Sequence, residues 1–184
     1  MRCCPKKNLD ESYGRSGELK VQYVLKWIEK KGYCLINNGD CINIENPQYI
    51  EFKQQIDHII IGKQGVFNIE SKSFSGKITI DENGRRYQDK LRFGIVDKNI
   101  VNPVFQIDRH HNLLESIIGN TIPIIDIICI ASDKTQIIGA KNCAIPVVRL
   151  DELERYILNY KSEKILSQDE INQVAEMIES HLVD

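Results

Sequence analysis

Two apolar stretches that carry charged residues restrict most strongly what this chain can fold into. Residues 55–61 and 66–73 have the composition of β-strands, and the segment 62–65 between them, Gly-Lys-Gln-Gly, predicts a tight connection. We therefore expect the two strands to pair as a β-hairpin. Charges inside apolar strands are costly unless they are paired or bind a metal. The charged residues of this hairpin are accordingly the first candidates for chemistry.

Asp57, Glu70 and Lys72 are these charged residues. Alternate residues of a strand share a face, so Glu70 and Lys72 point the same way, and hairpin pairing puts Asp57 roughly opposite Glu70. Two close carboxylates repel each other unless a cation intervenes. Mg²⁺ or Mn²⁺ takes oxygen ligands, and such an ion can polarise a phosphodiester and lower the pKa of bound water. A purely structural salt-bridge cluster is the alternative that the spacing leaves open.

The rest of the chain predicts helices packed on a mixed sheet. Helices are expected at 18–31, 103–119, 151–160 and 167–182, the last with capping-box spacing between Ser167 and Glu170. Further strands are expected at 33–36, 77–80, 122–131 and 145–148, with a loop or loose hairpin at 37–54 and a hairpin arm at 85–96. This order predicts an α/β fold in a single domain over residues 14–184, after an N-terminal arm over residues 1–13.

Composition agrees with an ordinary soluble domain and excludes several classes of protein. The 184 residues suit one domain, and there is neither an apolar run of about 18 residues nor a signal-peptide pattern. We therefore expect a cytoplasmic protein without a membrane contact. The net charge of -2 argues mildly against non-specific coating of DNA, but less against a nuclease, whose metal site needs acidic residues. The six cysteines form no CxxC pair, which favours reduced, structural thiols over a zinc site.

Basic residues gather in the hairpin arm, at Arg85, Arg86, Lys90 and Arg92. A solvated hairpin is one interpretation of this cluster, and a weak nucleic-acid-binding patch that faces phosphates is the other.

The histidines are weaker candidates. His58 adjoins Asp57, but strand alternation sends it to the opposite face, as a packed or exposed strand residue. His110 and His111 lie on the helix at 103–119, where a solvated or packed pair is favoured over a metal or proton-transfer role. The sequence has no GxGxxG, P-loop or GxSxG motif, so nucleotide binding and serine hydrolysis lack support.

Several motifs in order along the chain resemble the nuclease-related domain (NERD) family of the PD-(D/E)xK nuclease superfamily. They are Gly17-Glu18 at a helix start, Gln55-Ile-Asp-His58, Gly65-Val-Phe-Asn-Ile-Glu-Ser-Lys72, Gly76, and Asn102-Pro103 with Gln106. The resemblance runs from about Gly14 to Gln106, and the strand at 122–131 also fits. It implies a restriction-endonuclease-like core, in which a central mixed β-sheet is flanked by helices.

The resemblance also implies a role for each matching residue. Asp57 and Glu70 would be metal ligands, Lys72 the catalytic lysine, Glu18 an additional acidic residue, and Gln106 a polar residue brought by the following helix. The residues by themselves leave Glu18 open as a charge favoured by the helix dipole, and Gln106 open as a cap or hydrogen-bond partner. Ile56 precedes Asp57 where the superfamily name has proline, a departure that the domain family tolerates.

The sequence thus predicts a nuclease that hydrolyses phosphodiester bonds with Mg²⁺ or Mn²⁺, with DNA as the expected substrate. A catalytically weak or inactive nucleic-acid-binding or interaction module on the same fold is the second hypothesis. An ordinary α/β domain with a structural acidic cluster is the third. The intact trio favours the first hypothesis over the second, because a module that only binds does not need all three residues.

Overall fold

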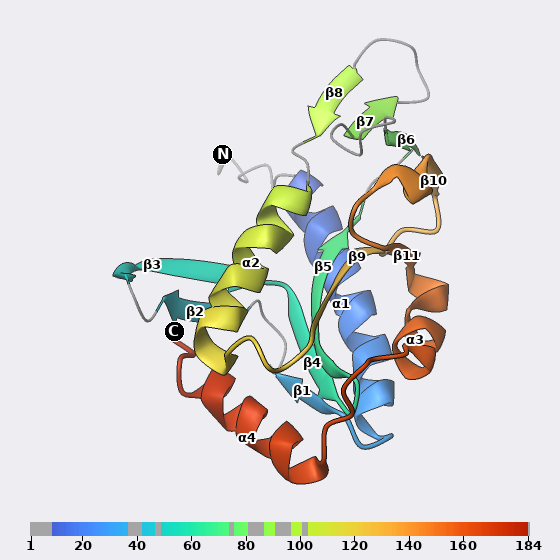
Figure 1. Cartoon of the computed structure of the whole chain (residues 1–184). Coiled ribbons are helices and arrows are strands. Elements are labelled where there is room, and N and C mark those ends of the chain that lie inside the picture. Colours follow the sequence, from blue (N-terminus) through green and yellow to red (C-terminus); the bar gives the residue numbers. More distant parts are fainter. Residues whose placement is uncertain are drawn as a thin grey trace, which may run out of the picture.

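A mixed β-sheet between two layers of helices forms the centre of the molecule (Figure 1). The computed structural model describes residues 9–36, 42–46, 49–73, 76–80, 87–90, 97–100 and 103–183. The sheet has five strands in the order β1-β4-β5-β9-β11. They are β1 (Cys34–Ile36), β4 (His58–Gly62), β5 (Gly65–Lys72), β9 (Ile124–Ile130) and β11 (Val147–Arg149). This architecture confirms the predicted α/β class and is consistent with a nuclease-like core.

The predicted hairpin is the middle of this sheet. β4 and β5 pair antiparallel, with Ile60 opposite Phe67 and Gly62 opposite Gly65. Gly65 has a φ of 128°, and a Cβ there would lie 2.3 Å from the carbonyl oxygen of Pro123, so only glycine suits this position. β5 then pairs parallel with β9, and β9 with β11. The apolar strand predicted at 122–131 is therefore central and buried, as expected for a parallel strand.

Each face of the sheet is covered by two helices. α1 (Leu9–Glu29) and α3 (Leu150–Asn159) pack on one face, whereas α2 (Pro103–Ile118) and α4 (Gln168–Glu179) cover the other (Figure 1). Alternation along the strands supplies both cores, because Phe67 and Ile69 face α1 and α3 while Ile59 and Ile61 face α2 and α4. The predicted capping box is confirmed at the start of α4, where Ser167 and Glu170 bond reciprocally.

Two smaller sheets flank the central one. β2 (Ile42–Asn46) and β3 (Tyr49–Ile56) form the hairpin that was predicted loosely at 37–54. β6 (Gly76–Ile80), β7 (Tyr87–Lys90), β8 (Asp97–Ile100) and β10 (Thr135–Ile138) form the other sheet, in the order β10-β6-β7-β8. β10 was not predicted. It is short and pairs with the distant β6, and sequence patterns do not reveal such a contact. A 3-10 turn, Ala140–Asn142, follows β10.

The end of the chain is tied to the β2-β3 hairpin. Leu182 forms a β-bridge with Ile44, and the Val183 N–H donates to the Asn43 carbonyl at 3.0 Å. Ile44 is fully buried in the same core as Ile171, Val174 and Ile178 of α4. α4 and the residues after it therefore hold the β2-β3 hairpin, which continues through Asp57 into β4.

The predicted start of the first helix was wrong. α1 begins at Leu9, whereas the sequence predicts a helix that begins at Glu18, directly after Gly17. A glycine inside a helix costs about 1 kcal/mol relative to alanine, but Gly17 lies where α1 meets the sheet. A Cβ at this position would be 2.7 Å from the Cβ of Ser73 and 3.3 Å from that of Ala131. The close approach of helix and sheet therefore requires this glycine within the helix. The predicted boundary between arm and domain stays a prediction.

The predicted strand at 55–61 is also corrected. β3 ends at Ile56 and β4 begins at His58, so Asp57 occupies a bend between two strands that belong to different sheets. The apolar run through Ile56, Ile59, Ile60 and Ile61 suggested one continuous strand. The chain changes sheets at Asp57 because Ile42 pairs with Ile56 on one side and Ile69 pairs with His58 on the other.

Two further predictions concern the membrane and the cysteines. Among the helices that the structure describes, none combines the length and the apolar character needed to cross a membrane. Cys34, Cys129 and Cys143 are thiols and not disulfides, and burial raises the pKa of the Cys129 thiol to about 12. This agrees with structural, reduced thiols at these three positions. Cys3, Cys4 and Cys41 lie outside the described residues.

Candidate active site

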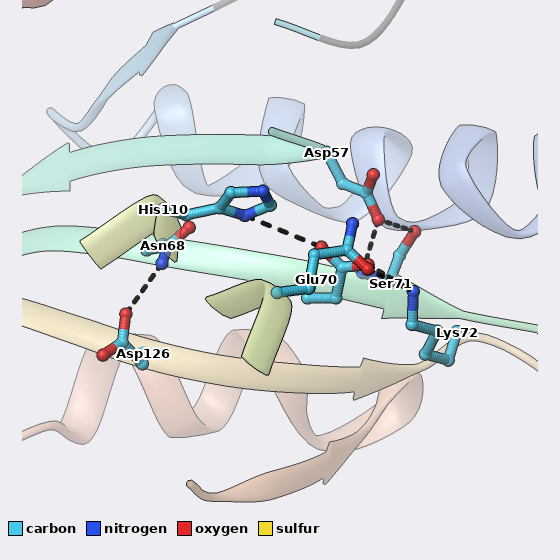
Figure 2. A network of polar contacts seen from close by, with 8 residues as sticks. Asp57, Asn68, Glu70, Ser71, Lys72, His110 and Asp126 are labelled. Carbon is cyan, nitrogen blue, oxygen red and sulfur yellow. Dashed lines mark hydrogen bonds and ion pairs between the residues drawn. The ribbon is translucent and has the colours of Figure 1, made fainter. Parts of the chain in front are cut away.

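The candidate site lies at the carboxyl end of β5, under the first turns of α2 (Figure 2). Glu70 and Lys72 are two residues apart on this strand and point to the side that α2 covers, as strand alternation predicted. Glu70 is paired in register with Ile128 of β9, and Lys72 with Ile130. Two central strands therefore fix the backbone beneath both side chains.

Glu70 is a buried carboxylate with one unsatisfied oxygen. Only 1% of the residue is exposed. The Lys72 ammonium donates to Oε1, whereas Oε2 is buried and has no hydrogen-bond partner in the part of the chain that the structure describes. Burial raises the pKa of Glu70, the charge of Asp57 contributes a smaller rise, and Lys72 opposes both effects, so that the pKa is about 7. An orphaned oxygen on a buried carboxylate is an unsatisfied acceptor, which a bound water or cation can satisfy.

Lys72 bridges Glu70 and α2. Its Nζ donates to Oε1 of Glu70 and, at 3.3 Å, to Oε1 of Gln106, in the first turns of α2. The lysine side chain remains 23% exposed. The ammonium is therefore held from both sides and still reachable from solvent. The prediction that Gln106 is brought to this cluster agrees with the contact, although its role in catalysis stays a prediction.

Asp57 binds the segment between Glu70 and Lys72 instead of lying opposite Glu70 within a strand. Its Oδ2 accepts from the Ser71 N–H at 2.8 Å and from the Ser71 hydroxyl at 3.0 Å (Figure 2). Asp57 lies in the bend between β3 and β4. At this bend its carboxylate takes the place of a backbone carbonyl as the acceptor for the Ser71 N–H. Asp57 is nevertheless close enough to raise the pKa of Glu70 through its charge.

His110 contributes a buried imidazole that the sequence reasoning did not place in the site. The residue is 3% exposed, and its Nδ1 lies 3.8 Å from Oε2 of Glu70. Burial lowers the pKa of His110 to about 4, so at neutral pH the ring is uncharged and this contact is not an ion pair. His110 is packed, as one of the predicted alternatives held, but it is packed against the site. Its position one helical turn after Gln106 was the available signal.

A second polar network adjoins the site on the same side of the sheet. Asn68 donates to Oδ1 of Asp126 at 2.7 Å, and Nδ1 of His111 lies 2.7 Å from Oδ2 of the same carboxylate. Asn68 precedes Glu70 by two residues on β5, so its side chain shares the Glu70 face. These contacts fasten α2 across β5 and β9, and they thereby fix the position of Gln106 and His110.

Glu18 approaches the site from the opposite layer. It follows Gly17, the residue at which α1 packs on Ser73 and Ala131, and its charge raises the pKa of Glu70 to a small degree. The predicted role of Glu18 as an additional acidic residue of the site stays a prediction. His58, by contrast, is buried beside Ile69 on the strand next to β5, and burial lowers its pKa to about 4. It is a packed strand histidine, as expected.

The side chains of the predicted basic patch lie outside the described part of the structure. Arg85, Arg86 and Arg92 lie outside the described residues. Lys90 belongs to β7 and pairs with Lys77, but its side chain is outside the described part of the structure. The weak nucleic-acid-binding role of these residues stays a prediction.

A comparison with protein families gives a match that spans the residues of this site. The nuclease-related domain family matches residues 13–131, which is more than half of the 184 residues. The chain belongs to the nuclease-related domain family. The matched part of this nuclease-related domain includes every residue of the site described above, from Glu18 on α1 to Asp126 on β9.

A relative from Bacillus anthracis provides a second comparison. The chain is 28% identical over 159 residues to an uncharacterized protein of that organism, a match that covers 84% of this chain and 66% of the relative. The chain thus spans about two thirds of the length of that relative. No solved structure matches this nuclease-related domain.

Proposed function

We propose that this nuclease-related domain is a divalent-metal-dependent nuclease that hydrolyses phosphodiester bonds, with DNA as the expected substrate. The observation that carries the proposal is the orphaned, buried oxygen of Glu70 beside Asp57 and Lys72. Burying a charged carboxylate in apolar surroundings costs free energy unless a cation pairs with it. The family match supports a nuclease-related function in general terms.

The residues present fit Mg²⁺ or Mn²⁺ better than a metal that needs three or four protein side chains as ligands. Within the described residues, no group of three or more His, Cys, Asp or Glu side chains could hold an ion. Mg²⁺ is commonly bound through one or two carboxylates together with water and substrate phosphates. Asp57 and Glu70 would supply these carboxylates. A divalent ion bound there would polarise the phosphodiester and lower the pKa of a water molecule.

The side chains of the protein would then divide the remaining work. Lys72 would stabilise negative charge on the phosphate or orient the attacking water, because its ammonium is held in place yet reaches solvent. Gln106 would position that ammonium. Neutral His110 would exclude water from the buried side of Glu70. The Ser71 hydrogen bonds would hold Asp57 in one orientation.

A cleavage assay across metals tests this function. We expect the full chain to cut DNA in Mg²⁺ or Mn²⁺ and to be inactive in EDTA, because both carboxylates need a cation to act on a phosphodiester. Single-stranded, double-stranded and nicked DNA and RNA of one sequence should be compared as substrates. Absence of cleavage of every substrate in every metal would contradict the proposal and favour a module that binds without turnover.

The pH dependence of stability provides an independent prediction. In EDTA, we expect the melting temperature of the wild type, measured relative to Glu70→Gln, to fall as the pH rises from about 4.5 to about 7. The reason is that Glu70 has an ordinary pKa of 4.5 and a pKa of about 7 when folded, so the folded state binds an extra proton in this window and loses that advantage as the pH rises. Saturating Mg²⁺ should reverse the loss above pH 7 in the wild type only.

His58 and His110, whose pKa values are lowered, are present in both proteins, so their effects cancel in the comparison. A melting-temperature difference that does not change between pH 4.5 and pH 7 would contradict the assignment of Glu70 as a carboxylate that burial keeps protonated.

A further inference from the structure

Large apolar side chains line the solvent side of α1, where the core does not need them. Leu19, Tyr23 and Trp27 are 52%, 66% and 50% exposed and follow one another at intervals of four residues. This spacing puts them on one face of the helix. The opposite face, with Val21, Leu25 and Ile28, is fully buried. α1 is therefore apolar on both sides, although packing accounts for only one of them.

Two neighbouring cavities extend from this face toward the end of the sheet. The first has a volume of about 600 Å³ and lies between α1 and Leu150, the first residue of α3. The second has a volume of about 460 Å³ and shares Lys20, Val24 and Leu150 with the first. We call the two together the α1 groove. Its walls are formed by Arg15, Ser16, Leu19, Lys20, Tyr23, Val24, Ile130, Ala131, Ser132, Asp133, Arg149, Leu150 and Asp151.

The α1 groove ends at the same edge of the sheet as the candidate active site, on the face that α1 and α3 cover. Its wall includes Ile130 and Ala131, at the end of β9. Ile130 is paired in register with Lys72, and the Ala131 N–H donates to the Lys72 carbonyl at 2.9 Å. Adjacent strands are about 4.8 Å apart. A ligand in the second cavity would therefore lie one strand away from the backbone of Lys72, whose side chain points to the other face of the sheet. A bound strand would pass the carboxyl end of β9 to reach that side chain.

The charges of the first cavity favour a polyanion, whereas the two cations and two carboxylates of the second cavity balance. Arg15 and Lys20 are part of the wall of the first cavity, and no carboxylate is among its lining residues. In the second cavity Arg149 accompanies Asp133 and Asp151, and its Nε lies 3.7 Å from Oδ1 of Asp151. Cations beside an exposed aromatic ring are the combination that binds single-stranded nucleic acid, through phosphate contacts and base stacking.

From these observations we infer that the α1 groove binds a single strand of nucleic acid that leads into the active site. A base would lie against Tyr23 and Leu19, and the neighbouring phosphates would lie against Arg15 and Lys20. The inference rests on the proposed function, because it assigns the path of the substrate strand. The first cavity falls within the size range of binding sites for small ligands, which suits one or two nucleotides.

A second copy of the chain is a poorer occupant of the same surface. In a twofold dimer the same patch of each subunit meets the other, so the Arg15 and Lys20 side chains of two copies would be brought close together. Like charges at an interface are unfavourable. A negatively charged strand has the complementary sign along the same cations.

The fluorescence of Trp27 tests the inference directly, because the chain has a single tryptophan. It lies four residues after Tyr23, about 6 Å along the helix. The full chain in EDTA, where cleavage is off, is titrated with an oligothymidylate of about 12 nucleotides. We expect binding that changes the Trp27 emission and weakens with added salt. Tyr23→Ala and Lys20→Glu should each weaken the affinity by about fivefold or more.

Two controls match these variants in exposure and lie away from the groove. Ile165→Ala removes a side chain that is 61% exposed before α4, and Lys63→Glu reverses an exposed charge in the β4-β5 turn, at the other end of β5. Both are expected to bind the oligonucleotide like the wild type. Tyr23 and Lys20 are exposed as well, so all four variants should keep their folded stability.

The outcomes separate this inference from the proposed function. If the wild type cuts DNA but Tyr23→Ala and Lys20→Glu bind the oligonucleotide normally, the groove is not the strand path and the inference fails alone. If both variants lose binding while the wild type cuts nothing in any metal, the groove assignment holds and the proposed cleavage fails. Self-association of the wild type that Tyr23→Ala abolishes, without any change in oligonucleotide binding, would overturn the inference in favour of a second copy.

Discussion

Replacing Lys72 with alanine is expected to reduce metal-dependent cleavage by about a hundredfold or more, because loss of one preorganised charge-stabilising donor typically costs this much. The ammonium contacts both Glu70 and Gln106 and remains partly exposed, so it can reach a phosphate while its position is fixed. Mg²⁺ binding, measured by calorimetry, should persist in Lys72→Ala, since both proposed carboxylate ligands remain.

Lys77→Ala is the matched control for this variant. Lys77 is an exposed lysine on β6, a strand of the neighbouring sheet. Its removal should leave cleavage unchanged. Equal activity of Lys72→Ala and the wild type would show that the lysine is structural and would favour the hypothesis of a salt-bridge cluster.

Replacing Asp57 with asparagine is expected to weaken Mg²⁺ binding by more than tenfold, which is the lower bound for the loss of an outer partner of a metal site, and to remove most cleavage. The amide oxygen of asparagine can still accept from the Ser71 N–H, so the folded structure keeps the contact that Oδ2 makes now. Metal affinity and cleavage should therefore fall while the melting temperature stays close to that of the wild type.

Asp57→Ala separates the structural role of Asp57 from its role in metal binding. Alanine removes both bonds to Ser71 and leaves a backbone N–H unpaired, which costs about 1–3 kcal/mol of unfolding free energy. Urea unfolding should thus rank Asp57→Ala below Asp57→Asn in stability. An Asp57→Asn variant that binds Mg²⁺ and cuts DNA like the wild type would exclude Asp57 as a ligand.

The central part of the fold could be predicted because it depends on local patterns. The 62–65 turn and the alternation along 66–73 determine the β4-β5 hairpin, and the apolar run at 122–131 identifies β9. β10 and the true start of α1 depend on contacts between distant segments. Gly17 illustrates the difference, because its place inside a helix is explained by Ser73 and Ala131 and not by its neighbours in sequence.

The candidate site was predictable to a similar degree. Strand alternation places Glu70 and Lys72 together, and the family resemblance added Gln106, which contacts Lys72. The bond between Asp57 and Ser71 was not foreseen, because it requires the break between β3 and β4. His110 was underestimated for another reason. Its distance from Glu70 depends on how α2 is rotated against the sheet, and the Asn68, Asp126 and His111 contacts fix that rotation.

The position of β11, α3 and α4 has a consequence for how the protein can be divided. The family match ends at Ala131, the residue after β9. A fragment cut there would turn β9 into an open edge and uncover the faces that Leu153, Ile157, Val174 and Ile178 now bury. It would also release the hairpin before Asp57 from its bridge to Leu182. The smallest piece that can fold is therefore longer than the matched segment that contains the candidate site. That segment cannot be transplanted into another protein without β11, α3 and α4.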